Sequence, residues 1–170
     1  MNARKHSRLK GYDYSQNGAY FVTFCSQNRE EILSKIRVGP DALIGPLVEL
    51  TAYGELVEDA IQGAVLAYPN VDIPCYAIMP NHVHLLVVME RNGPMGASGP
   101  TLGTVVRSIK TKVTRAVGKS IWQEKFYDHV IRNYDDYLQI WNYIESNPAK
   151  WSEDTYYDGK SSMPITLKES

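Results

Sequence analysis

The segment at residues 79–89, with the sequence MPNHVHLLVVM, constrains the fold of this chain more than any other stretch. Pro80 and Asn81 predict a tight turn, and the Val- and Leu-rich run after them predicts a buried β-strand. Because side chains alternate between the faces of a strand, His82 and His84 should share one face. Two imidazoles on so apolar a strand need partners for their nitrogens, which favours a bound divalent metal ion. The alternative is a pair of hydrogen-bonded core histidines.

Length and composition predict one domain with a substantial core, because 44% of the 170 residues are hydrophobic. The net charge of −1 creates no global basic field, so any nucleic-acid binding must come from a local patch.

Cys25 and Cys75 lie in apolar runs and are expected to be buried free thiols. No apolar run approaches membrane-spanning length, and we expect a soluble, cytoplasmic protein. The predicted core spans about 19–151, between a basic arm at 1–18 and a polar tail at 152–170.

Hydrophobic periodicity and turn residues predict the remaining elements. Strands are expected at 19–25, 71–79 and 126–132 and helices at 47–67, 101–117 and between Asn133 and Pro148, with Gly/Pro-rich loops at 39–46 and 91–100 and little regular structure after Trp151. The β-α-β-β-α-β order predicts an α+β, ferredoxin-like antiparallel sheet with an additional C-terminal helix. The histidine strand is third in this order and should be central. Pro74 argues that the strand at 71–79 lies at an edge.

The helix predicted at 101–117 has one apolar side and one basic side. Its apolar residues recur with the helical period, and no acidic residue occurs from 101 to 120. The basic side consists of Arg107, Lys110, Lys112, Arg115 and Lys119. Such a stripe is commonly a solvated face, but like charges without acidic partners favour contacts with phosphates.

The last helix combines a start signal, an apolar stripe and a polar pair. Asn133 can cap it, and Tyr137 falls within the apolar stripe that continues through Ile144. Tyr143 and Asn147 are four residues apart and share a neighbouring face. An amide oxygen suits Mg²⁺ or Mn²⁺, and a tyrosine beside a cation can act as a nucleophile. Ordinary packing is the alternative, since the chain has 12 tyrosines.

The ordered set of motifs resembles the REP-associated tyrosine transposases, a branch of the single-tyrosine HUH transposases. The resemblance covers about residues 19–151 and begins with the His-hydrophobic-His motif at 79–84. It continues through residues 102–110, Trp122-Gln123, residues 126–132, and the Tyr-Ile-Glu-Ser-Asn-Pro motif at 143–148 with Trp151. It implies an HUH fold whose C-terminal helix carries the nucleophile.

The resemblance also implies a site and a reaction. His82 and His84 would bind Mg²⁺ or Mn²⁺, Tyr143 would be the nucleophile, and Asn147 would be the third ligand by its position. The reaction would be metal-assisted cleavage and rejoining of single-stranded or hairpin DNA through a 5′-phosphotyrosine link, by a monomer or homodimer. The residues expected to contact DNA are Arg107, Lys110, Lys112, Arg115, Lys119, Trp122 and Arg132.

Two other classes of protein share parts of this pattern. A histidine-triad nucleotide hydrolase also has a His-hydrophobic-His strand, but it needs a third histidine where this chain has Leu86. A non-catalytic nucleic-acid-binding module could use the same ferredoxin-like sheet. Tyr143 together with both histidines distinguishes the enzyme from such a module, because a pure binding protein has no use for that combination. Trp122 and Tyr127 could serve as stacking platforms for bases, although core packing is the usual role of such residues.

Overall fold

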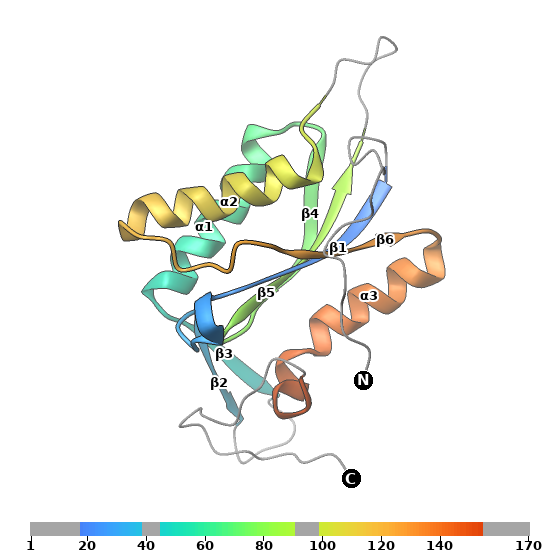
Figure 1. Ribbon diagram of the computed structural model, residues 1–170. Helices are drawn as coiled ribbons and strands as arrows, with labels where there is room; N and C mark the ends of the chain where they lie inside the picture. Colours follow the sequence, from blue (N-terminus) through green and yellow to red (C-terminus); the bar gives the residue numbers. More distant parts are fainter. Residues whose placement is uncertain (1–17, 39–44, 91–98, 155–170) are drawn as a thin grey trace.

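The computed structural model describes residues 18–38, 45–90 and 99–154, and Figure 1 shows the arrangement of their elements. In chain order these are β1 (Gly18–Cys25), the 3-10 helix η1 (Gln27–Arg29), β2 (Ser34–Val38), β3 (Pro46–Leu50), α1 (Ala52–Ala67), β4 (Val71–Ile78), β5 (His82–Met89), α2 (Leu102–Val117), β6 (Tyr127–Ile131), α3 (Tyr134–Ser146) and the 3-10 helix η2 (Pro148–Glu153). Within these residues, every helix is too short or too polar to cross a bilayer.

The main sheet has the strand order β4-β5-β1-β6, and each neighbouring pair is antiparallel. This arrangement confirms the ferredoxin-like order expected from the sequence. The histidine strand β5 is central, between β1 and β4. Pro74 lies in β4, which is an edge strand as expected, and the register of β4 shifts between Asp72 and Cys75. Proline has no backbone N–H and cannot donate a hydrogen bond to a neighbouring strand. An edge strand tolerates this loss because one of its sides has no neighbour.

Helices cover both faces of this sheet, with α1 and α2 on one face and α3 on the other (Figure 1). Because side chains alternate along β5, Val83, Leu85 and Val87 join the core formed with α1 and α2. Leu86 joins the second core, which includes Ile144 of α3. His82 and His84 share the face of Leu86 and therefore lie on the α3 side of the sheet.

A second, two-stranded sheet pairs β2 with β3 and was not expected from the sequence. The helix predicted from residue 47 was wrong over its first turn, because residues 47–50 belong to β3. Thr51 explains the boundary, since its side-chain oxygen accepts a hydrogen bond from Gly54 N–H and caps α1. Pro46, the last residue of the predicted loop at 39–46, is the first residue of β3, and residues 39–44 lie outside the described residues. Both strands of the hairpin contact η2.

The two remaining predicted helices have the caps and buried faces that position the site. The expected apolar side of α2 is buried, from Leu102 to Val113. In α3, the Asn133 side chain accepts a hydrogen bond from Asp136 N–H, which confirms the predicted cap. Of the apolar stripe expected on α3, Ile144 is fully buried. Tyr137, Ile140 and Trp141 are only partly buried, so part of the apolar stripe of α3 is exposed to solvent.

Candidate metal and nucleophile site

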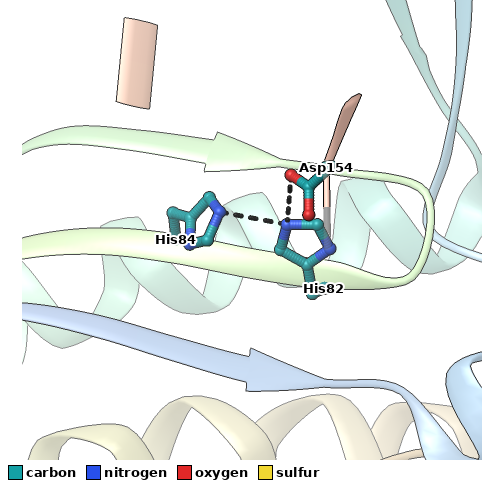
Figure 2. Close-up of side chains that lie close together, drawn as sticks. All are labelled: His82, His84 and Asp154. Carbon is teal, nitrogen blue, oxygen red and sulfur yellow. Dashed lines mark hydrogen bonds and ion pairs between the residues drawn. The ribbon is translucent and has the colours of Figure 1, made fainter. Parts of the chain in front are cut away.

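Two imidazole rings and one carboxylate meet on the α3 side of the sheet (Figure 2). His82 and His84 are completely buried, and their Nε2 atoms are 3.0 Å apart. Asp154 Oδ2 lies 3.5 Å from His82 Nε2. One potential ligand atom from each of the three residues falls within 4.8 Å of the other two. Imidazole nitrogens and a carboxylate oxygen form a donor set for a divalent cation.

The outer nitrogens of both rings are held by hydrogen bonds to polar side chains. His82 Nδ1 lies 2.8 Å from Asn81 Oδ1, and His84 Nδ1 lies 2.7 Å from Thr23 Oγ1. Histidines that bind metals usually make such a bond through the second nitrogen, because it orients the ring. The ring orientations and the inward-facing Nε2 atoms therefore fit a cation site better than ordinary core packing.

The third protein ligand expected from the resemblance was Asn147, and the structure adds Asp154 as another candidate. Asn147 caps the C-terminus of α3 and is buried. Its side-chain Oδ1 has no hydrogen-bond partner among the described residues. Asp154 follows η2 and lies within the segment where we expected little regular structure. Sequence reasoning missed it because one aspartate in a polar stretch carries no local sign of contact with a distant strand.

Tyr143 lies next to the histidine pair and remains accessible to solvent. Its ring centroid is 5.4 Å from that of His84 and 5.8 Å from that of Phe21, which it meets edge to face. The residue is 41% exposed. Tyr137 is the nearest competitor on α3, but its ring stacks on Tyr134 instead, and burial raises its pKa. Tyr143 therefore combines access to solvent with proximity to the candidate metal ligands, which is the placement expected of a nucleophile.

The predicted DNA contacts on α2 fall into two groups. Arg107, Lys112, Arg115 and Lys119 are exposed, as a phosphate-binding stripe requires. Lys110 is partly buried, and its Nζ donates hydrogen bonds to the backbone oxygens of Gln123 and Glu124, at 2.7 and 3.3 Å. Burial lowers the pKa of Lys110. This ammonium group ties the segment after α2 to the helix.

The structure contradicts the expectation that Trp122 is a platform for DNA bases. Trp122 is only 5% exposed, packs edge to face against Phe24, and donates its indole N–H to the backbone oxygen of Lys110 at 3.3 Å. A ring buried in this way cannot stack on a base. Arg132 is exposed just after β6, and Tyr127 is partly buried on the same face as the histidines.

Comparisons with known proteins agree with this fold, although no protein-family model matches the sequence. An uncharacterised protein of Haemophilus influenzae is 31% identical over 92% of this chain and 94% of its own length. A REP-associated tyrosine transposase of Escherichia coli K12 is 29% identical over 81% of this chain and 70% of its own length. A solved structure of a REP-associated tyrosine transposase bound to a REP hairpin superposes with a TM-score of 0.59 and 27% identity, covering 86% of this chain and 74% of that one.

Both of these named relatives are transposases, and the common fold extends over most of this chain. The chain is therefore similar to REP-associated tyrosine transposases over most of its length.

The position of Asp154 generates a test of the third ligand. We expect Asp154→Asn to weaken Mn²⁺ binding, measured by calorimetry, by at least about tenfold, because a hard cation loses a charged oxygen ligand. Glu153→Gln removes the neighbouring, exposed carboxylate and is the matched control, with unchanged affinity expected. Normal affinity for Asp154→Asn combined with a loss in Asn147→Ala would instead assign the third ligand to Asn147.

Proposed function

We propose that this protein cleaves and rejoins single-stranded or hairpin DNA, with Tyr143 as the nucleophile. The observation that carries the proposal is the half-exposed phenol of Tyr143 beside the buried His82–His84 pair. The related solved structure is bound to a REP hairpin, which supports DNA of that kind as the substrate class. Accessibility matters here because a strand of DNA must reach the tyrosine oxygen from solvent.

The proposed reaction proceeds by two transesterifications. In the first, the Tyr143 oxygen attacks a phosphorus atom, forming a 5′-phosphotyrosine bond, and the bond from phosphorus to the 3′-oxygen breaks. The phenol loses its proton to solvent and the departing 3′-oxygen takes up a proton as a free hydroxyl. In the second, a 3′-hydroxyl attacks the phosphotyrosine, restoring the phosphodiester and the free tyrosine. The energy of the original bond is retained, so rejoining needs no nucleotide cofactor.

His82 and His84, with Asp154 or Asn147, would hold the divalent cation, and Mg²⁺ or Mn²⁺ suits the oxygen donors of this set. A bound cation supplies neutralisation of the charge that develops on the phosphate oxygens. The chain's own contribution is to orient Tyr143. Phe21 would help to orient it, because the centroid of its ring lies 5.1 Å from that of His84 and 5.8 Å from that of Tyr143. The Phe21 ring therefore packs against both the proposed nucleophile and a proposed metal ligand.

The basic stripe on α2 would bind a different part of the DNA from the scissile phosphate. The sheet separates α2 from Tyr143, because α2 packs on the face opposite to α3 (Figure 1). A groove of about 460 Å³ runs between α2 and the segment at 120–126, and Arg107, Lys125 and Thr111 contribute to its lining. Cationic and hydroxyl groups in a groove suit a phosphate backbone, so the stem of a hairpin is the proposed occupant.

A non-catalytic DNA-binding module remains the competing function, and the site argues against it. Binding alone would not require a buried imidazole pair whose Nε2 atoms converge beside a carboxylate. Burying such polar groups lowers the free energy of unfolding unless hydrogen bonds or a bound ion satisfy them. DNA binding alone would likewise not require a solvent-accessible tyrosine beside the two imidazoles.

Tyr143→Phe removes one oxygen and keeps the ring, so packing against Phe21 and DNA binding should survive. We expect this variant to form no covalent adduct with a labelled hairpin oligonucleotide in the presence of Mn²⁺, as judged by denaturing gel electrophoresis. Tyr137→Phe is the matched control on the same helix and should form adduct at the wild-type level. An adduct in Tyr143→Phe would place the nucleophile elsewhere.

The α2 stripe predicts a salt-dependent contribution to DNA affinity. Lys112→Gln with Arg115→Gln removes two exposed cations and should flatten the slope of log affinity against log salt by about 1 to 2, because fewer counterions are released. Lys35→Gln with Arg37→Gln removes the same charge from the small sheet and serves as the control. Equal slopes for the wild type and the α2 variant would mean that the stripe is a solvated face.

A further inference from the structure

The outward side of α2 forms a ridge with a hollow along each flank. The first hollow is the groove between α2 and the segment at 120–126. A second hollow, also of about 460 Å³, lies on the other flank beside Tyr68, which follows α1. Arg107 and Thr111 line both hollows, so these two residues stand on the crest between them. They are four residues apart, which places them on one face of the helix.

The other cations of the ridge divide between its two flanks. Lys112 and Arg115 line the hollow beside Tyr68, and both are exposed. Lys125 lines the opposite hollow from its far wall and is also exposed. Glu124 is the one acidic residue among the described residues that line either hollow. Each hollow therefore offers solvated cations to a polyanion, and the crest separates the two.

Arg107 differs from these cations because it lies on the crest rather than on one flank. Among the described residues it has no ion-pair partner, whereas Arg37 pairs with Glu49 at 2.8 Å. The outward side of α2 otherwise carries small hydroxyl residues, namely Thr104, Ser108 and Thr111. Small side chains allow a helix to approach a binding partner closely. The guanidinium of Arg107 is therefore the group of the crest with the longest reach.

The dimensions of the ridge match those of a DNA duplex. A helix with its side chains is about 10–12 Å across, and the major groove of B-form DNA is about 12 Å wide. A duplex that receives α2 in its major groove would place one phosphate strand in each hollow, and its base edges would face the crest. An arginine in that position can donate hydrogen bonds to both N7 and O6 of a guanine, which is the commonest sequence-specific contact.

We propose that α2 enters the major groove of the hairpin stem and that Arg107 reads a guanine base there. Lys112 and Arg115 hold the phosphates of one strand, and Lys125 holds those of the other. Phosphate contacts fix the register of a protein on a duplex but carry no sequence information, so Arg107 is the specificity-determining residue. This proposal rests on the binding of a hairpin stem in the proposed function and adds the readout of the stem sequence.

Selection from a pool of DNA hairpins with randomised stems tests the readout on the full-length protein, without metal or cleavage. We expect the wild type to enrich guanine at a stem position and Arg107→Ala to lose that enrichment. Arg37→Ala removes an exposed arginine from β2 and is the matched control, which should keep the enrichment. Enrichment of the same guanine by Arg107→Ala would overturn the assignment. A wild type that binds all stems equally would refute the readout but not the proposed function, whereas a wild type that binds no hairpin would contradict both.

Replacing the enriched guanine by 7-deazaguanine removes the N7 acceptor and leaves base pairing and phosphates unchanged. We expect the wild-type affinity, measured by fluorescence anisotropy at fixed salt, to fall at least about threefold, because one hydrogen bond of a bidentate contact is lost. Arg107→Ala should bind both hairpins equally. The same stem made of RNA should be bound without preference for the guanine, because the major groove of A-form RNA is too deep and narrow to admit a helix. An equal preference on RNA would contradict insertion of α2 into a major groove.

Ethylation of single phosphates maps the two flanks of the ridge separately. We expect ethylation on either strand of the stem to weaken binding by the wild type. Lys125→Gln should become insensitive to ethylation on one strand, and Lys112→Gln with Arg115→Gln should become insensitive on the other, because one strand lies in each hollow. Loss of sensitivity on the same strand in both variants would show that the ridge does not separate the strands.

Discussion

The approach of two buried imidazole nitrogens to 3.0 Å is the contact on which the rest of the site depends. Only a proton or a cation can stabilise two such atoms at that distance, because bare lone pairs repel each other. The central position of β5 enforces the approach, since strands on both sides fix its register. A slip of one residue would turn Val83 and Leu85 toward α3 and bury both histidines in the apolar core under α1 and α2.

The groups around this pair come from parts of the chain that are far apart in sequence. Thr23 belongs to β1, Asn81 to the turn before β5, Tyr143 to α3, and Asp154 to the end of η2. Trp151 in η2 lies against the ring of His82, with the centroids 6.0 Å apart. The β2–β3 hairpin contacts η2. A peripheral hairpin therefore supports the segment that brings a carboxylate to the histidines, and the same segment continues directly from α3, which carries Tyr143.

Sequence reasoning succeeded where a local pattern determines the outcome. Alternation along a strand placed His82 and His84 on one face, and a capping asparagine located the start of α3. The order of elements was sufficient for the ferredoxin-like sheet. Each of these depends on residues close together in sequence, so propensity and periodicity report them directly.

The errors concern contacts between distant residues. The alternation of Lys35, Ile36 and Arg37 is too short to distinguish a strand from a loop, although Ile36 is buried between two exposed cations. The charge pattern of α2 could not show that backbone oxygens of the following segment engage Lys110. Asp154 reaches the site only because η2 turns back toward β5, and nothing in its neighbourhood of the sequence indicates that path.

Pulsed electron paramagnetic resonance of Mn²⁺ bound to the ¹⁵N-labelled full chain tests the central claim most directly. A cation held by His82 and His84 predicts hyperfine coupling to two imidazole nitrogens, which disappears when both residues are replaced by alanine. A wild-type spectrum with no imidazole coupling, or coupling that persists in the double variant, would show that the buried histidine pair is not the metal site.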